Sequence, residues 1–588
     1  MTAVEKMAPS DQVSRRPTMG NPAISWRGVV FVLVMLVLVY QVVLPFIMIV
    51  WTSFKTMRPG EEGFLSLTTF SFDNYVKAFG TSEFWGATYE TLTFSLASTL
   101  LAFVFGAFIA WVVERTNTPC AKLIGTIMLA RIVIPSILIT IVWILLASPN
   151  IGILNALIKN ATGIRNFLNV YSFGGMVWIH AIEMVPLAYL LLSSAFQAMD
   201  PRLEEASTMT GAGTFRTLFR ISLPLALPAV GAALLLLFIT TVETFEVPLL
   251  IGGRADIKVY STEIFFNTSQ TPVDWGLSGA YSMAMLVLAI VLLAFYFRLV
   301  RHGERYQTIT GKDFKPRKTD LGKWRYLTFA ISLLLVFMIT ILPFLMMVYV
   351  SLLPFYQPPS AIAFETMTLK NYADLFEDDY LINPMINSTI LGVVTATFVV
   401  LFVTLIAYFA HKSRMPGRRV LDFLAFGSIA IPSVVLGAAF MWFYLLVPLP
   451  VIGTLTIIFL AYVTKFMPVS LRFVSTSMGQ IHSELEEAAQ VAGVSWVRNF
   501  FKIMLPLLKP GLLGAWFWVM VHAYRELTLA LMLARADNRT AAVVIYDLWE
   551  QGSFMSVSAF GVLMFLVLMI LVSISNAIGR RYGVKEQL

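Results

Sequence analysis

The sequence has little charge and almost no cysteine. Only 13% of its 588 residues are charged, against about 25% in typical soluble globular proteins, while 58% are hydrophobic and the mean hydropathy is +0.78. This composition excludes a soluble globular protein and predicts an all-α protein that crosses a membrane many times. The single cysteine, Cys120, excludes an intramolecular disulfide and a thiolate metal cluster.

Catalytic and nucleotide-binding signatures are also missing. The sequence contains no Gly-x(4)-Gly-Lys-Ser/Thr loop, so the chain is not its own ATPase by that mechanism. It has no His-Glu-x-x-His pair, and we find no Ser-His couple on facing spans. We therefore expect a non-catalytic chain without a cofactor of its own. The net charge of +8 comes from basic residues beside apolar runs, which indicates membrane orientation and not nucleic-acid binding.

Twelve apolar runs are long enough to cross about 30 Å of hydrocarbon. They form two sets of six. The first set is Gly28–Phe54, Phe84–Val113, Leu123–Ala147, Phe173–Phe196, Leu223–Ile251 and Gly279–Val300. The second set is Tyr326–Leu353, Ile382–Ala410, Leu421–Leu446, Ile452–Phe473, Pro506–Leu533 and Val557–Ile578.

The two sets repeat each other in sequence. Leu44-Pro45-Phe46 recurs as Leu342-Pro343-Phe344, Ile134-Pro135-Ser136 recurs as Ile431-Pro432-Ser433, and Pro186 recurs as Pro468. An even number of spans in each half makes the repeat parallel, with an axis along the membrane normal. We expect a tail at 1–27, a first half at 28–300, a basic linker at 301–325 and a second half at 326–588. Extra chain in the first half falls near Asn150–Tyr171.

Basic residues predict the orientation. They are concentrated in the linker and after the eighth span, at Arg301, Arg305, Lys312, Lys315, Arg317, Lys318, Lys323, Arg325, Lys412, Arg414, Arg418 and Arg419. These loops and both termini are therefore expected in the cytoplasm. The loops at Lys55–Glu83 and Pro354–Tyr380 have mixed or acidic charge and are expected on the opposite side.

One polar stretch between spans occurs twice. Glu486-Glu487-Ala488-Ala489, followed by Gly493, matches Glu204-Glu205-Ala206-Ser207, followed by Gly211. In each copy an Ile and a Leu-Pro follow the glycine at the same spacing. Ser483 and Glu486 form a Ser-x-x-Glu capping box, and the glycines suit a left-handed end to a short helix. Ala488 shares a face with Ala492, as Ala206 does with Thr210, which favours close approach of a partner.

The pattern Glu-Ala-Ala-x-x-x-Gly-x(9)-Ile-x-Leu-Pro resembles the signature loop of binding-protein-dependent ABC importer permeases. The second copy matches at every fixed position, and the first differs in Ser207. The resemblance implies the type I permease fold and an inner-membrane location. It also implies two ATP-binding subunits that use ATP and Mg²⁺, docked at Glu204, Glu205, Ala206, Gly211, Glu486, Glu487, Ala488, Ala489 and Gly493. An extracytoplasmic solute-binding protein would deliver the cargo.

Ionisable groups within spans are costly and indicate function. The fifth span contains Glu243 and Glu246, and the eleventh contains His522, Tyr524, Arg525 and Glu526. These residues are candidates for a substrate path or gate, and the alternative is an ion pair that only joins helices. The alignment of the two groups is ambiguous by two residues. His180, Glu183, Arg131 and Lys465 are weaker candidates, with Arg131 expected to snorkel or pair and Lys465 expected near a helix end.

The fused halves and Tyr524-Arg525-Glu526-Leu527-Thr528 resemble ferric-iron permeases. Fe(III) prefers oxygen donors, which Glu243, Glu246, Tyr524 and Glu526 would supply. Thiamine, phosphorylated sugars and other small organic solutes stay open as alternative cargoes. A twelve-span secondary transporter is an alternative of another class. The loop Glu114–Cys120, however, lacks the Gly- and Arg-rich signature expected there.

Overall fold

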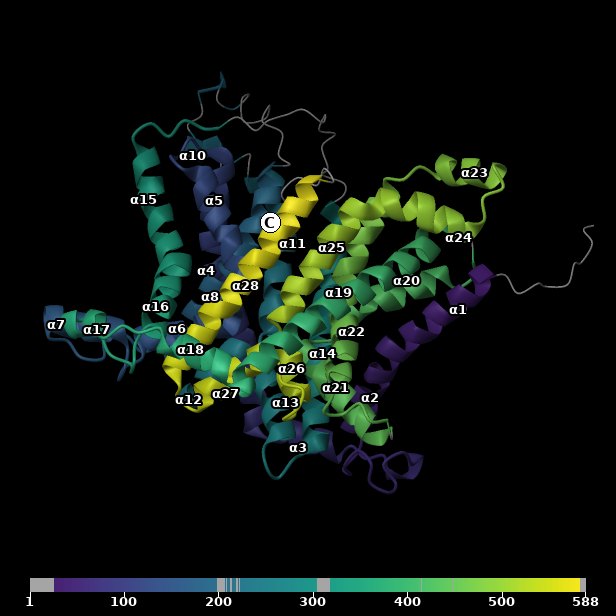
Figure 1. Ribbon diagram of the computed structural model, residues 1–588, viewed down its shortest axis with the longest axis horizontal. Helices are drawn as coiled ribbons and strands as arrows, with labels where there is room; N and C mark the ends of the chain where they lie inside the picture. Colours follow the sequence, from purple (N-terminus) through teal and green to yellow (C-terminus); the bar gives the residue numbers. More distant parts are fainter. Residues whose placement is uncertain are drawn as a thin grey trace, which may run out of the picture.

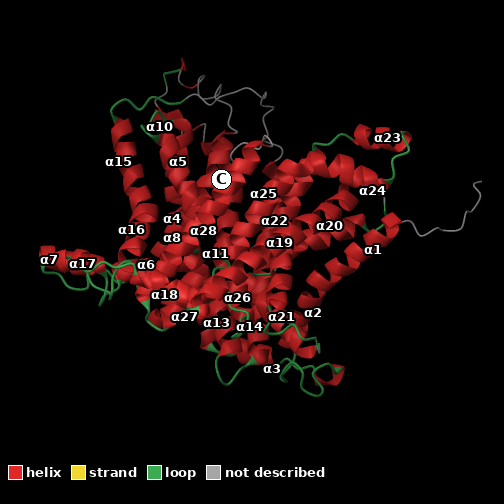
Figure 2. Ribbon diagram, viewed as in Figure 1, coloured by secondary structure: helices red, strands yellow, loops and turns green. Residues whose placement is uncertain are grey.

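The structure is a computed structural model, and every regular element among the residues that it describes is a helix (Figure 2). It describes residues 26–197, 207, 209–211, 214–217, 220, 223–303, 318–413, 415–447 and 449–581. The helices of the first half are α1 (Trp26–Leu38), η1 (Val39–Val43), α2 (Leu44–Ser53), η2 (Leu67–Thr69), α3 (Asp73–Phe79), α4 (Ser82–Arg115), α5 (Ala121–Ala130), η3 (Arg131–Val133), α6 (Ser136–Ala147), α7 (Ile153–Thr162), α8 (Phe173–Gln197), α10 (Thr214–Thr217), α11 (Leu223–Val242), η5 (Pro248–Gly252), α12 (Gly253–Ala255), α13 (Tyr260–Ser269) and α14 (Trp275–Gly303).

The second half repeats this order. Its helices are α15 (Trp324–Val336), η7 (Phe337–Ile341), α16 (Leu342–Ser351), α17 (Ala361–Glu365), α18 (Lys370–Glu377), α19 (Asp379–Lys412), α20 (Arg418–Gly427), η8 (Ser428–Ala430), α21 (Ser433–Leu446), α22 (Leu455–Gly479), α23 (Ser483–Val491), α24 (Trp496–Asn499), η9 (Phe500–Met504), α25 (Leu505–Tyr524), α26 (Thr528–Leu533), α27 (Ala541–Glu550) and α28 (Phe554–Arg581). The extra chain of the first half contains the helix α7.

The two halves exchange their first helices. Within each half the long helices pack as equivalent pairs, α4 on α8 and α19 on α22. By contrast, α1 packs on α19 and α20 of the second half, and α15 packs on α4 and α5 of the first half. A buried hydrogen bond of 3.1 Å joins Thr464 Oγ1 to the side-chain oxygen of Gln41. Because each half holds a helix of the other, the two halves cannot separate without exposing apolar surface.

Nine helices among the described residues are long and apolar enough to cross a membrane, or up to eleven if two bent pairs count as one span each. The residues 229–242 of α11 form a further, shorter apolar helix in the position of the fifth predicted span. Many large apolar side chains on the outer helices are exposed, including Leu33, Leu100, Phe295 and Leu334. Such surfaces are stable against lipid and not against water.

The third and ninth predicted spans are each broken by a sharp bend. The chain bends by 103° between η3 and α6 and by 109° between η8 and α21. Pro135 and Pro432 lie at these bends, and the residues before them, Ile134 and Ile431, have extended backbones. Proline disfavours the helical conformation in the residue that precedes it, so each helix ends there and a new one starts.

The fifth and eleventh spans are also interrupted, after Val242 and after Tyr524. Pro248 has no N–H to donate to the carbonyl of Thr244, which instead accepts a hydrogen bond of 2.6 Å from Ser261 Oγ. At the second interruption the carbonyl of Glu526 accepts a hydrogen bond of 3.2 Å from the Tyr462 hydroxyl. Side chains thus replace the missing helical hydrogen bonds at both interruptions.

The elements between the long helices gather at two opposite ends. In Figure 1, α10, α23 and α24 lie along the upper edge. The short helices α3, α12 and α13 lie toward the lower edge, and α7 and α17 project at the left. The described part of the first repeated stretch, next to α10, and the second, which contains α23, therefore lie at one end of the molecule.

Candidate functional site

The second signature loop begins with helix α23 and ends at a left-handed glycine. Gly493 has φ +71°, and nothing lies within 4 Å of a side chain added there. The N–H of Val494 bonds to the carbonyl of Ala489 over 3.0 Å, and the N–H of Ala492 bonds to the carbonyl of Ala488, also over 3.0 Å. This closes the helix end and stops it at the glycine.

The first signature loop has the same glycine geometry, with φ +77° at Gly211. Ser207, which replaces the second alanine of the pattern, is buried, and its hydroxyl lies 2.8 Å from the Thr217 hydroxyl. Glu204, Glu205 and Ala206 lie outside the described residues. The predicted capping box cannot be placed either, because the side chains of Ser483 and Glu486 lie outside the described set.

Each loop carries one prominent apolar side chain two residues before its glycine. Met209 is 89% exposed and Val491 is 91% exposed. In the second loop Glu487 and Ala488 are exposed as well, whereas Ala489 is buried. An apolar side chain held this far into solvent at two equivalent positions is suited to burial against a partner.

The interruptions also show which charged residues of the two halves occupy equivalent positions. Glu243 follows the end of α11 and Arg525 follows the end of α25, so these two residues are equivalent. Likewise, Glu183 of α8 and Lys465 of α22 each lie three residues before the internal proline of their helix. The structure thereby resolves the ambiguity of two residues and shows that equivalent positions carry opposite charges.

These residues form one charged cluster inside the helix bundle. Lys465 Nζ lies 2.7 Å from Glu526 Oε1. The Glu526 carboxylate also accepts hydrogen bonds of 2.9 and 3.2 Å from the N–H groups of Leu529 and Ala530, which caps α26. Lys465 lies in the middle of α22, so its predicted position near a helix end was wrong. The ion pair joins α22 to the interruption of the eleventh span.

Arg131 and Arg525 meet at the bend of the third span. The Arg525 guanidinium donates to the carbonyl of Ile132, and Arg131 Nη1 donates to the carbonyl of Ile134 over 3.2 Å. Arg131 is only 2% exposed, and within the described part of the chain its Nε and Nη2 atoms have no hydrogen-bond partner. Of the two predicted alternatives for Arg131, snorkelling or pairing, this burial excludes snorkelling to the surface. The Glu183 carboxylate interacts electrostatically with the Arg131 guanidinium.

The remaining predicted residues take different roles. Glu246 interacts electrostatically with Glu183, Glu526, Arg525 and Lys465, and its buried Oε2 atom has no hydrogen-bond partner among the described residues. His522 stacks on Trp518 and its Nδ1 lies 2.8 Å from the Trp518 carbonyl oxygen. Tyr524 is buried in the apolar core. The cluster therefore includes Glu243, Glu246, Arg525 and Glu526 together with Arg131, Glu183 and Lys465, to which the sequence analysis gave less weight.

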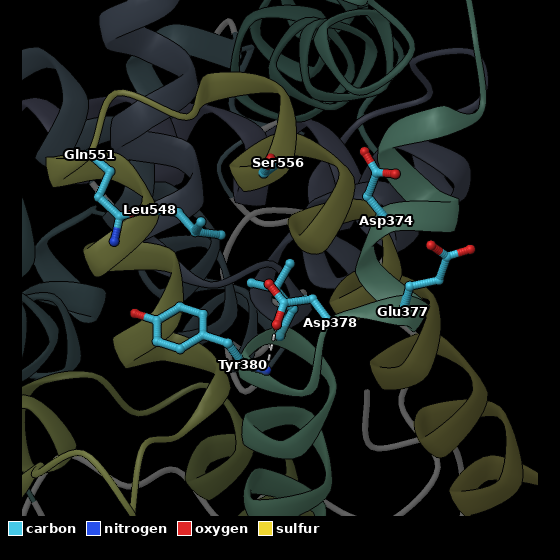
Figure 3. A pocket seen from close by; sticks show the side chains of 8 residues that line it. Asp374, Glu377, Asp378, Tyr380, Leu548, Gln551 and Ser556 are labelled. Atoms are coloured by element: carbon cyan, nitrogen blue, oxygen red, sulfur yellow. Dashed lines mark hydrogen bonds between the residues drawn. The ribbon is translucent and has the colours of Figure 1, made fainter.

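A separate acidic pocket of about 460 Å³ lies where α18 meets α19, α27 and α28. Figure 3 shows Asp374 and Glu377 on α18, and Asp378, which accepts a hydrogen bond from the Tyr380 N–H. In the first half the residue equivalent to Asp374 is Lys77, which forms an ion pair with Asp274. No group of three or more His, Cys, Asp and Glu side chains within the described part of the chain is arranged to hold a metal.

Comparison with known proteins gives the family of this bundle. The family of binding-protein-dependent transport system inner membrane components matches residues 102–305 and 403–581, one match in each half. The chain belongs to this family. It is therefore a multi-pass inner-membrane permease and a non-catalytic component of its transport system.

Curated relatives include ferric transport permeases. The chain is 28% identical over 414 residues to the ferric transport system permease protein FbpB of Actinobacillus pleuropneumoniae, with 70% of this chain and 59% of that protein covered. It is 30% identical over 375 residues to the putative ferric transport system permease protein FbpB 1 of Haemophilus influenzae, with 63% of this chain and 58% of that protein covered. The matches thus span somewhat more than half the length of these relatives.

Among solved structures, the chain resembles a bacterial ABC transporter involved in the import of alginate. The sequence identity is 21%, the TM-score is 0.35, and the match covers 42% of this chain and 87% of the other.

Proposed function

We propose that this permease is the translocation subunit of an ATP-driven importer. The supporting observation is the pair of signature loops, which end at left-handed glycines and hold Met209 and Val491 in solvent at one end of the bundle. Two separate ATP-binding subunits dock there, one on each loop, and use ATP and Mg²⁺. Because the chain lacks a phosphate-binding loop, the energy for transport comes from these subunits.

In this proposal the docking end, the linker and both termini face the cytoplasm. The basic residues of the linker and of the segment after α19 support this orientation. The opposite end, with α3, α7, α17 and α18, receives an extracytoplasmic solute-binding protein. Closure of the ATP-binding subunits tips the halves between inward-open and outward-open states, which requires that ATP bind the two states with different affinity.

Ferric iron is the proposed cargo. The ferric transport permeases among the relatives support it. Thiamine and phosphorylated sugars are the alternative cargoes and are distinguished by the uptake measurement below.

The test is purification of the full chain from its native membranes in mild detergent, followed by native mass spectrometry and reconstitution. We expect two ATP-binding subunits for each chain and uptake of radioactive Fe(III) that requires ATP and the binding protein. Uptake of thiamine or a sugar phosphate under the same conditions would replace iron as the cargo. A chain that purifies alone and drives ion-coupled uptake without ATP would contradict the proposal.

A further inference from the structure

Two short helices carry the same exposed apolar stripe, one in each half. Phe72, Val76 and Phe79 follow one another at spacings of four and three residues along α3, so they share one of its faces. All three side chains are exposed, Phe72 and Val76 to 70% each. The equivalent residues of α18 are also apolar and exposed, namely Leu369, Ala373 and Phe376. The repetition of this stripe indicates a role that is common to both halves.

Each stripe is fixed at the end of an exchanged helix. The side-chain amide of Asn74 in α3 donates to the carbonyls of Ser53 and Lys55, at the end of α2, over 3.0 and 2.8 Å. The amide of Asn371 in α18 donates in the same way to the two equivalent carbonyls at the end of α16, over 2.8 Å in both cases. Each amide thus bonds carbonyls that a helix end leaves open, and it holds the short helix in one rotation about its axis.

The charges beside the stripes are not repeated. Lys77 of α3 corresponds to Asp374 of α18, and Gly80 corresponds to Glu377. The apolar positions therefore keep their character while the charged positions change. A protein partner that docks across both halves would meet different charges on each, whereas a lipid surface meets both halves alike. The feature shared by the two helices is therefore suited to lipid contact.

Lipid is also the surface next to which both stripes are fixed. The exchanged helices expose large apolar side chains, among them Ile47 of α2 and Leu345 of α16. Helix α3 packs on α14 as well, which is the least buried of the nine candidate spans among the described residues. Both short helices lie toward the end of the bundle that is opposite α23 (Figure 1). An amphipathic helix held where a lipid-exposed span ends is placed at the level of the lipid headgroups.

We propose that α3 and α18 are interfacial helices that lie in the lipid headgroup layer on the side of the membrane opposite the signature loops. Their apolar stripes are buried at the boundary between headgroups and acyl chains. Their charged faces, which carry Lys77 and Asp374, stay in water and are left for the solute-binding protein. The two helices thereby fix the depth at which α2 and α16 end. This inference rests on the membrane location shown by the family and is independent of the cargo.

The test measures the depth of spin labels on the full chain in nanodiscs of phosphatidylethanolamine and phosphatidylglycerol. Cys120→Ser first removes the single cysteine. Val76→Cys and Phe376→Cys then place labels on the stripes, and Asp73→Cys and Glu377→Cys place matched control labels on the charged faces of the same helices. Oxygen concentrates in lipid and a hydrophilic nickel complex stays in water. We therefore expect a higher ratio of oxygen to nickel collisions at the stripe labels than at the control labels.

Equal ratios on the two faces would overturn the inference. If a stripe variant does not fold, labels introduced by Phe72→Cys and Leu369→Cys on the same stripes decide in its place. Purified solute-binding protein is then added to the labelled nanodiscs. Unchanged ratios at the stripe labels support lipid contact, whereas a joint fall in oxygen and nickel collisions there would assign the stripes to the protein partner and overturn the inference.

The two proposals fail in different ways. A complex that imports nothing but keeps the difference between the two faces contradicts the proposed function alone. A complex that imports cargo with equal ratios on the two faces contradicts this inference alone.

Discussion

Lys465 of α22 and Glu526 at the interruption of the eleventh span form an ion pair of 2.7 Å within the bundle. The Glu526 carboxylate simultaneously caps α26. The Glu526 side chain thus holds the start of α26 in place and also pairs with the Lys465 ammonium. Changes at Glu526 should therefore affect stability and transport together.

The first prediction is that Glu526→Gln lowers stability and import. The amide oxygen keeps one capping acceptor but loses the ion pair. Breaking a fully buried pair costs ~3–5 kcal/mol, and the partial exposure of Lys465 reduces the expected loss to about 1–3 kcal/mol. Thermal unfolding in detergent and reconstituted uptake measure the two effects. Binding of the ATP-binding subunits should persist, and normal uptake would show that the cluster is only structural.

The second prediction concerns the left-handed glycine of α23. Gly493→Val should uncouple transport from ATP hydrolysis, because a β-branched residue is strained at φ +71° and the helix end must rearrange. Gly493→Asn should retain most activity, since asparagine tolerates this conformation. The measurement is ATP hydrolysis and uptake in the same proteoliposomes.

Gly552, between α27 and α28, provides a matched control. It has φ +74° and equally open surroundings, and α27, which it follows, lies toward the end of the bundle opposite α23 (Figure 1). Gly552→Val should produce similar strain without uncoupling. Equal uncoupling by both substitutions would mean that strain alone, and not docking, explains the effect at Gly493.

The third prediction is that Met209→Asp and Val491→Asp each weaken binding of an ATP-binding subunit. An aspartate at either position removes the apolar contact with the bound subunit. Its charge also loses hydration when the interface forms, which is unfavourable. We expect a loss of about tenfold or more in affinity, measured by co-purification under titrated detergent or by surface plasmon resonance. Leu67→Asp, at an exposed apolar position in η2, is the control and should leave binding unchanged. Retention of both subunits by the double variant would argue against docking at these residues.

The fourth prediction tests the packing of α4 on α8. A methyl group added at Gly106 would lie 2.5 Å from the Ala188 side chain and 3.0 Å from its backbone. Gly106→Ala should therefore destabilise the protein by about 1–3 kcal/mol through overpacking. Gly86→Ala on the same helix meets nothing within 4 Å and should be neutral or stabilising, because alanine favours helix. Equal melting temperatures for the two variants would contradict this packing.

Apolar length and repetition were readable from the sequence because lipid requires long apolar helices and because both halves carry the same motifs. The positive φ of Gly211 and Gly493 was predicted correctly, since only the local backbone decides it. The bends at Pro135 and Pro432 were missed, although the prolines were recognised as repeats. Apolar runs on both sides of each proline read as one span when only hydropathy is considered.

The charged cluster shows where sequence reasoning stops. The sequence placed Glu243, Glu246, Arg525 and Glu526 in spans, but it left their alignment ambiguous and gave less weight to Arg131, Glu183 and Lys465. A possible signal was present, since Glu183 and Lys465 both precede an internal proline by three residues. Whether such residues meet depends on how interrupted helices pack, and hydropathy carries no information about that.

The sequence alone determined the membrane environment, the two-fold repetition and the signature loops, because these follow from composition and from local backbone preference. The tertiary structure decided that the halves exchange their first helices, that four predicted spans are bent or interrupted, and that charges distant in sequence form one cluster. Those features arise from contacts between helices, for example between Lys465 and Glu526, which form only when the bundle assembles.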